Sequence, residues 1–297
     1  PLVLLIHGWP ESWYSWRHQI QALSAAGYKV AAPDVRGYGG SDKPEPIEAY
    51  DMANMTADMA GLVDAMGREP AVVIGHDWGA PIAWNTALLH ADKVRAVAGL
   101  SVPYTGPGPA PFIEIAKKIY RDQFFYQIYF QDPGIAEAEL EADVRDALRK
   151  IYYWISGEGL CARTLDNKPA DAKLLDGMED PGQLPPWMSA EDLDYYVSQF
   201  KESGFRGPLN RYRNHYRDFE FLSSHGDRKI LQPAAFISGT LEPVLNFVPG
   251  VDLIANMRKK LGDLRIVEMI DGAGHWVQQE RPDEVNATLL RFLSELS

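Results

Sequence analysis

The motif Gly75-His76-Asp77-Trp78-Gly79 has the residue types and spacing of a nucleophile turn. It follows a short apolar run and precedes a helical pattern, so we expect Asp77 at the tip of a sharp strand-to-helix turn. Glycines two residues on either side of the tip permit a strained backbone and close packing. A carboxylate is already ionised at neutral pH, so Asp77 can attack a strained or activated carbon, as in an epoxide or alkyl halide, and form an ester. The alternative is that Asp77 only caps the helix.

Hydrolysis of such an ester needs a general base, for which His275 is the candidate. It lies in the glycine-rich segment 271–276, directly after the last predicted strand. Catalytic side chains converge at the carboxyl ends of parallel strands. Glu242, in the loop after the strand predicted at 234–238, is the preferred acid to orient this base, with Asp252 a distant second. The alternative for Glu242 is a solvated loop glutamate.

Ester hydrolysis also develops negative charge on an oxygen, which backbone N–H groups can stabilise. The candidates are the N–H groups of Trp9 and Trp78. Both tryptophans also carry apolar bulk to the pocket. A structural role for both tryptophans in the core is compatible with the role of their backbone N–H groups.

The other histidines have no spacing that suggests a metal site, and CxxC and HExxH motifs are absent, so no metal is expected. His7 and His76 are expected to be structural, and four others are expected in helices or on the surface: His18, His90, His215 and His225. The stretch Gly37–Gly40 lacks the third glycine and the helix entry of a dinucleotide site.

Composition limits the class of protein. The 297 residues are 46% hydrophobic and 24% charged, which suits one large α/β domain with an insertion. The net charge of −12 argues against nucleic acid and anionic membranes as partners. Cys161 is the only cysteine, so no internal disulfide can form and a reducing, cytoplasmic location is expected. No run reaches the roughly 20 apolar residues of a transmembrane helix, and the opening run is too short for a signal peptide.

Strand and helix patterns alternate toward both ends of the chain. Strands are expected at 2–6, 28–32, 71–74, 94–100, 234–238 and 265–270, and helices at about 12–26, 52–66, 78–90, 247–261 and 281–296. This alternation predicts an α/β fold, with a parallel sheet covered by helices on both faces.

A long helical segment interrupts the alternation. It begins at the hinge-like, Pro- and Gly-rich stretch 103–111 and contains many aromatic residues but no clear strand. We therefore expect an α/β core at 1–104 and 230–297, with a helical lid at 105–229. The lid should cover an apolar pocket above the carboxyl ends of the strands.

These motifs carry a resemblance that spans nearly the whole chain. The chain resembles the α/β-hydrolase-fold epoxide hydrolases, both the bacterial enzymes and the C-terminal domain of mammalian soluble epoxide hydrolase. GHDWG alone is shared with haloalkane dehalogenases, whereas the two lid motifs are much more specific. The core motifs are HGWPESWYSWRHQ (7–19), DVRGYGGSDKP (34–44), GHDWG (75–79) and GAGHW (272–276), and the lid motifs are FYQIYFQDPG (125–134) and SGFRGPLNRYRN (203–214).

The resemblance implies roles that composition does not assign. Two lid tyrosines, Tyr126 and Tyr212, would hydrogen-bond the epoxide oxygen, although by composition Tyr129 looks as good. The Trp9–Pro10 peptide bond would be cis, which would aim the Trp9 N–H inward. The residues expected to contact substrate are Trp9, Pro10, Trp78, Phe124 and Trp276.

Two departures from the family pattern stand out. Many relatives carry Asp at the orienting-acid position, where this chain has Glu242. Relatives also have further strands before the His-Gly-Trp-Pro loop, so the chain is expected to be a trimmed one that lacks them.

The sequence thus predicts an epoxide hydrolase that converts a small apolar epoxide and water to a vicinal diol, without a cofactor. A haloalkane dehalogenase and a non-catalytic ligand-binding protein on the same scaffold are the alternatives. A homodimer is compatible with the sequence, which does not specify the oligomeric state.

Overall fold

Six parallel strands form one sheet in a computed structural model, which describes residues 1–67, 69–162 and 168–296. The strand order is β2-β1-β3-β4-β5-β6. Their bounds are β1 Leu2–Ile6, β2 Lys29–Ala31, β3 Ala71–His76, β4 Val94–Leu100, β5 Ile230–Gly239 and β6 Leu261–Ile270. Because all strands run in the same direction, their carboxyl ends meet at one edge of the sheet.

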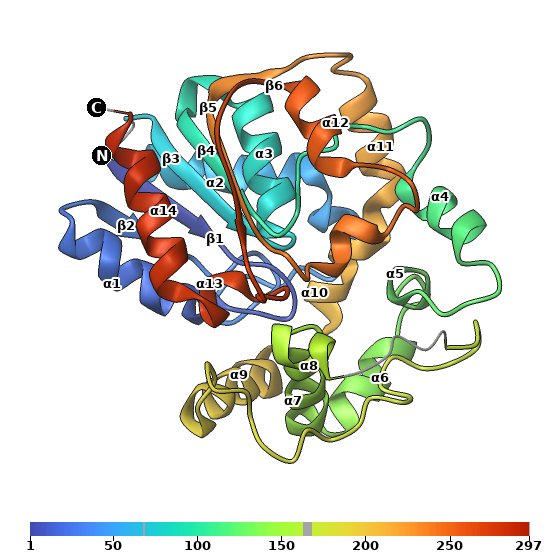
Figure 1. The fold of residues 1–297 in the computed structure, drawn as a ribbon. Helices are drawn as coiled ribbons and strands as arrows, with labels where there is room; N and C mark the ends of the chain where they lie inside the picture. The colour runs from blue at the N-terminus through green and yellow to red at the C-terminus, as the bar shows by residue number, and fades with distance from the viewer. Residues whose placement is uncertain (68, 163–167, 297) are drawn as a thin grey trace.

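Helices cover both faces of this sheet (Figure 1). Side chains alternate along each strand, so Leu4 and Val73 join one buried cluster and Leu5 and Ile74 the other. The first cluster packs against α2 (Met52–Ala65), α3 (Gly79–Leu89) and α12 (Leu253–Lys260), and the second against α1 (Arg17–Ala25) and α14 (Pro282–Ser294). This confirms the predicted α/β fold.

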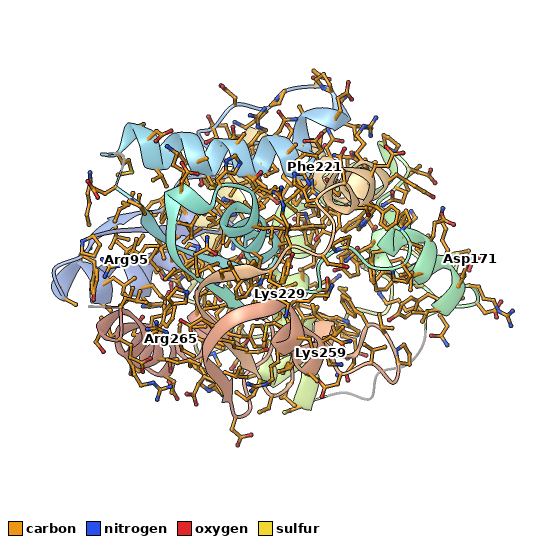
Figure 2. The ribbon with its side chains drawn as sticks, turned by 90° about the horizontal axis from the view of Figure 1, so that it is seen from above. Arg95, Asp171, Phe221, Lys229, Lys259 and Arg265 are labelled. Carbon is orange, nitrogen blue, oxygen red and sulfur yellow. The ribbon has the colours of Figure 1, made fainter. Side chains whose placement is uncertain are left out.

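Between β4 and β5 the described chain forms helices joined by loops, with no strand. This helical insertion extends away from the two chain ends, which lie close together in Figure 1. In Figure 2, Arg95 at the start of β4 and Asp171 in the insertion lie at opposite sides of the molecule. The helices of the insertion are α4 Phe112–Ile119, α5 Tyr126–Tyr129, α6 Ile135–Ala142, α7 Val144–Trp154, α8 Gly157–Cys161, α9 Ala190–Ser203, α10 Arg206–Asn210 and α11 His215–Ser223.

Two expected helices differ from those observed. The helix expected from Ser12 starts as a 3₁₀ turn at Trp13–Trp16 and becomes α1 only at Arg17. The helix expected at 247–261 starts only at Leu253, because Pro249 cannot donate a backbone hydrogen bond and Gly250 adopts φ 75°. None of the helices in the described ranges is both long and apolar enough to cross a bilayer.

Candidate active site

Asp77 lies directly after β3, at the tip of a turn that only glycine neighbours permit. Its φ is 50°, a left-handed conformation that side chains rarely adopt. A Cβ on Gly75 would lie 1.9 Å from the Gly79 carbonyl oxygen, and one on Gly79 would lie 2.0 Å from the Ile6 carbonyl oxygen. The two glycines therefore let the start of α3 approach β1 and β3, which fixes Asp77 at the carboxyl edge of the sheet.

His275 lies between two carboxylates. Its Nε2 is 3.3 Å from Asp77 Oδ2, and its Nδ1 is 2.9 Å from Glu242 Oε2. All three side chains are buried, and Glu242 is only 1% exposed. Glu242 also accepts the Val244 N–H at 2.9 Å, so its carboxylate is fixed at the end of β5. The structure thus brings together the three residues that were expected to act as one unit.

The two carboxylates determine the protonation of His275. Burial alone would lower the pKa of His275, but the charges and hydrogen bonds of Glu242 and Asp77 raise it well above its usual value. The imidazole is therefore an imidazolium that bridges two anions while Asp77 is ionised.

A backbone N–H group holds the other oxygen of the Asp77 carboxylate. The Trp9 N–H donates to Asp77 Oδ1 at 2.7 Å, and the Trp9–Pro10 peptide bond is cis. A Cβ on Gly8 would lie 2.4 Å from the Asp77 Cβ, so only glycine allows this approach. The Trp78 N–H has no hydrogen-bond partner among the described residues, and it follows Asp77 directly. The Trp9 amide thus binds the Asp77 carboxylate, and the Trp78 amide follows Asp77 in the chain without a hydrogen-bond partner among the described residues.

Tyr126 and Tyr212 lie side by side, with ring centroids 5.8 Å apart. Burial, with the nearby charge of Asp77, raises the pKa of both phenols well above the usual value for tyrosine. Both therefore stay protonated. Gln127 Nε2 donates to the Tyr126 hydroxyl at 2.9 Å, which leaves the Tyr126 proton free to be donated elsewhere.

A cavity of about 810 Å³ opens beside Asp77, Trp78 and Tyr126. A volume of this size accommodates a drug-sized ligand. Most of its other walls are apolar, and they include Pro81, Phe112, Ile115, Phe219, Phe247 and Leu253.

Of the five residues expected to contact substrate, only Trp78 lines this cavity. Trp276 is fully buried and donates its indole N–H to the Tyr152 carbonyl at 2.8 Å, so it supports His275 from behind. Phe124 packs against Tyr129, with ring centroids 5.6 Å apart. Outside this cavity lie Trp9, Pro10, Phe124 and Trp276.

Two further buried carboxylates fix the loop that carries His275. Glu11 Oε2 lies 2.8 Å from His76 Nδ1, and His76 Nε2 lies 2.7 Å from the His275 carbonyl oxygen. Glu280 accepts the N–H groups of Gly274, Trp276 and Gly157, each at 2.8 or 2.9 Å. His76 therefore has a specific structural contact, because it anchors the main chain at His275.

Sequence reasoning missed Arg211 and did not expect His215 in the wall of a cavity. Arg211 is buried over the Trp78 ring, 4.6 Å from its centroid, and pairs with Asp218. Burial lowers the pKa of Arg211 to about 10. His215, expected in a helix or on the surface, starts α11 but is buried in the cavity wall. The one sequence signal that could have pointed to Arg211 was its place as a charged residue beside Tyr212 in the lid motif 203–214.

The described residues offer no group of three or more His, Cys, Asp or Glu side chains that could hold a metal ion. The structure places Asp77, His275 and Glu242 in one buried hydrogen-bonded group. Two phenols and an apolar cavity lie beside it.

Comparisons with known proteins show the family to which the chain belongs. The family model described as alpha/beta hydrolase fold matches residues 1–282. Epoxide hydrolase A of Mycobacterium tuberculosis is 48% identical over 299 residues, which cover 100% of this chain and 91% of that protein. Bifunctional epoxide hydrolase 2 of Rattus norvegicus is 39% identical over 295 residues, which cover 99% of this chain and 51% of that protein.

Solved structures give the same result. An epoxide hydrolase from an endophytic Streptomyces superposes with a TM-score of 0.94 at 47% identity, covering 100% of this chain and 89% of that one. Epoxide hydrolase A from Mycobacterium thermoresistibile gives a TM-score of 0.92 at 47% identity, with coverages of 99% and 91%. The chain belongs to the alpha/beta hydrolase fold family. Within it, the chain belongs with the epoxide hydrolases.

Proposed function

We propose that this protein hydrolyses an apolar epoxide to a vicinal diol through a covalent ester on Asp77. The observation that carries the proposal is His275 held between Asp77 and Glu242, beside a cavity that Tyr126 also lines. Such a set has no role in passive binding. The helical insertion at 105–229 would act as the lid, because it supplies both phenols.

The first step opens the epoxide ring. Asp77 Oδ2 attacks one ring carbon while Oδ1 stays bound to the Trp9 N–H. A new C–O bond forms to Asp77 as the ring C–O bond breaks. The ring oxygen leaves as an alkoxide and takes a proton from Tyr126 or Tyr212.

The second step hydrolyses the ester. Once Asp77 is esterified its charge is lost, so the proton of His275 can pass through solvent to the tyrosinate left by ring opening, and the neutral imidazole can then accept a proton from water. The hydroxide attacks the Asp77 carbonyl carbon, and the Trp9 and Trp78 N–H groups stabilise the resulting oxyanion. Collapse breaks the ester bond and His275 protonates the departing diol oxygen. The remaining proton of the attacking water then passes from the Asp77 carboxyl group to His275, which restores the ionised Asp77 and the imidazolium.

A His275→Gln variant tests the proposal. It should open an epoxide but fail to hydrolyse the ester, so the protein mass should rise by the mass of the epoxide, with the adduct on a peptide containing Asp77. The parent should form diol and, over many turnovers in heavy-oxygen water, incorporate the label into Asp77. A parent that forms neither diol nor adduct would instead be a ligand-binding protein.

Replacing either lid phenol separates this function from that of a haloalkane dehalogenase. Tyr126→Phe or Tyr212→Phe should slow diol formation by roughly 10²-fold, because a general acid is lost. A dehalogenase has no use for paired phenols. Unchanged rates in both variants, together with halide release from chloroalkanes, would favour that alternative.

A further inference from the structure

The large cavity meets Asp77 on the side of Trp78 and Tyr126, which both line it. Much of the remaining wall comes from α3, α11, α12 and the loop segment 102–110. An apolar chain attached to an epoxide at Asp77 can therefore extend along these helices, among walls that are mostly apolar.

An aromatic block of Trp9, Phe130 and Tyr212 closes another side of the site. The Trp9 N–H donates to Asp77 Oδ1. The Phe130 ring packs against three others, with its centroid 5.1 Å from that of Trp9, 5.0 Å from that of Tyr212 and 5.5 Å from that of Tyr126. The exposed fractions are 6% for Trp9, 0% for Phe130 and 1% for Tyr212. Because rings that line an open space keep accessible surface, the block has no room for a chain.

The site is packed behind His275 as well. Trp276 and Tyr152 are fully buried, with ring centroids 4.8 Å apart, and the Tyr152 hydroxyl donates to the Pro10 carbonyl at 2.6 Å. Around Asp77, the described residues therefore leave space for a long substituent on the cavity side, but not toward the aromatic block or behind the base.

An epoxide carries its substituents on two ring carbons, and in a trans epoxide these substituents point in opposite directions. The cavity can take one of them. A second long substituent would have to push the aromatic block apart, and extra methylene groups forced into a well-packed interior are costly. A hydrogen atom or a methyl group on the second ring carbon avoids this cost.

We propose that the favoured substrate is an epoxide with a single long apolar substituent, and that Phe130 excludes a second one. The inference rests on the proposed epoxide hydrolysis and adds the chemical class of the substrate. Phe130 acts on specificity here and takes no part in the bond-making steps.

The test uses four epoxides that share one butyl substituent: 1,2-epoxyhexane, trans-2,3-epoxyheptane, trans-3,4-epoxyoctane and trans-5,6-epoxydecane. The other ring carbon carries hydrogen, methyl, ethyl and butyl in turn. In the parent, kcat/KM should fall by about tenfold or more from the epoxyheptane to the epoxydecane, because the added carbons meet a packed wall. An open wall would give the opposite order, since the added carbons would then be buried in apolar surroundings.

Phe130→Ala should open the block and raise the ratio of kcat/KM for the epoxydecane to that for the epoxyheptane by about tenfold. Phe130→Leu removes less volume and should raise the ratio by a smaller factor, so it tests the inference even where the alanine variant does not fold. Each ratio is taken within one variant, so a general loss of activity cancels.

Phe112→Leu is the matched control, since Phe112 lines the cavity and packs against Phe125 and His215 rather than the block. It should leave the ratio unchanged. A parent that hydrolyses the epoxydecane as fast as the epoxyheptane, or a ratio that neither Phe130 variant raises, would overturn the inference, while turnover of 1,2-epoxyhexane would still support the proposed function. No turnover of any of the four epoxides would overturn both.

Discussion

Replacing Asp77 by Asn should lower the pKa of His275. The imidazole lies between the Asp77 and Glu242 carboxylates, which together hold its pKa well above the usual value. Asparagine keeps the shape of the side chain and removes its charge, as formation of the ester would. The variant therefore mimics the charge state of the proposed intermediate.

The magnitude follows from the geometry. Unit charges 3.3 Å apart, the distance from His275 Nε2 to Asp77 Oδ2, attract by about 5 kcal/mol at an effective dielectric constant of about 20. Without this attraction, Glu242 alone opposes the effect of burial, which lowers the pKa of His275. The proposed mechanism needs this change, because it would let the imidazolium release its proton and then act as a base.

The assay is NMR titration of the His275 ring proton on Cε1, assigned by its absence in His275→Gln. The pKa of His275 should be lower in Asp77→Asn than in the parent. Asp58→Asn is the control, because Asp58 pairs with Arg36, and it should leave the His275 titration unchanged. An equal pKa in parent and Asp77→Asn would refute the reasoning that Asp77 holds the proton on His275.

Two other substitutions test how the site is held. In Gly8→Ala the new Cβ would lie 2.4 Å from the Asp77 Cβ, so kcat/KM should fall by roughly 10²-fold or more in a protein that still shows the parent's circular dichroism spectrum. In Glu280→Gln the amide NH₂ must face either the Trp276 N–H or the Gly157 and Gly274 N–H groups, because both carboxylate oxygens accept backbone N–H groups, so urea unfolding should show a loss of about 2–4 kcal/mol. A neutral effect of either substitution would contradict the corresponding packing or hydrogen-bond argument.

The nucleophile half of the site could be predicted because its signals are local. A strand, two glycines and a helix are contiguous around Asp77, and the turn they predict is present. His275 and Glu242 could be assigned because both follow strands of one parallel sheet, whose carboxyl ends meet. The predicted strand topology was therefore enough to place these two residues near each other, without any knowledge of their contacts.

The lid half could not be derived in this way. Tyr126 and Tyr212 were selected only by resemblance, because helical periodicity does not say which of many aromatic residues faces a distant sheet edge. The predicted start of the helix at 247–261 was wrong for a local reason, because Pro249-Gly250 interrupts the helix. The burial of His215 depends on contacts with Trp78 and Phe112, more than 100 positions away along the chain in each case.

Glu280 links these two halves physically. One carboxylate oxygen accepts N–H groups from Gly274, beside the base, and from Gly157, at the start of α8 in the helical insertion. A Cβ on Gly157 would lie 2.1 Å from the Gly272 carbonyl oxygen, so the insertion rests directly on the loop that carries His275. A shift of the insertion that carries the phenols would therefore also displace the base. In the proposed mechanism, ring opening and ester hydrolysis need the phenols and His275 in fixed positions around the Asp77 carboxylate, so an anchor that they share would preserve the geometry of both steps.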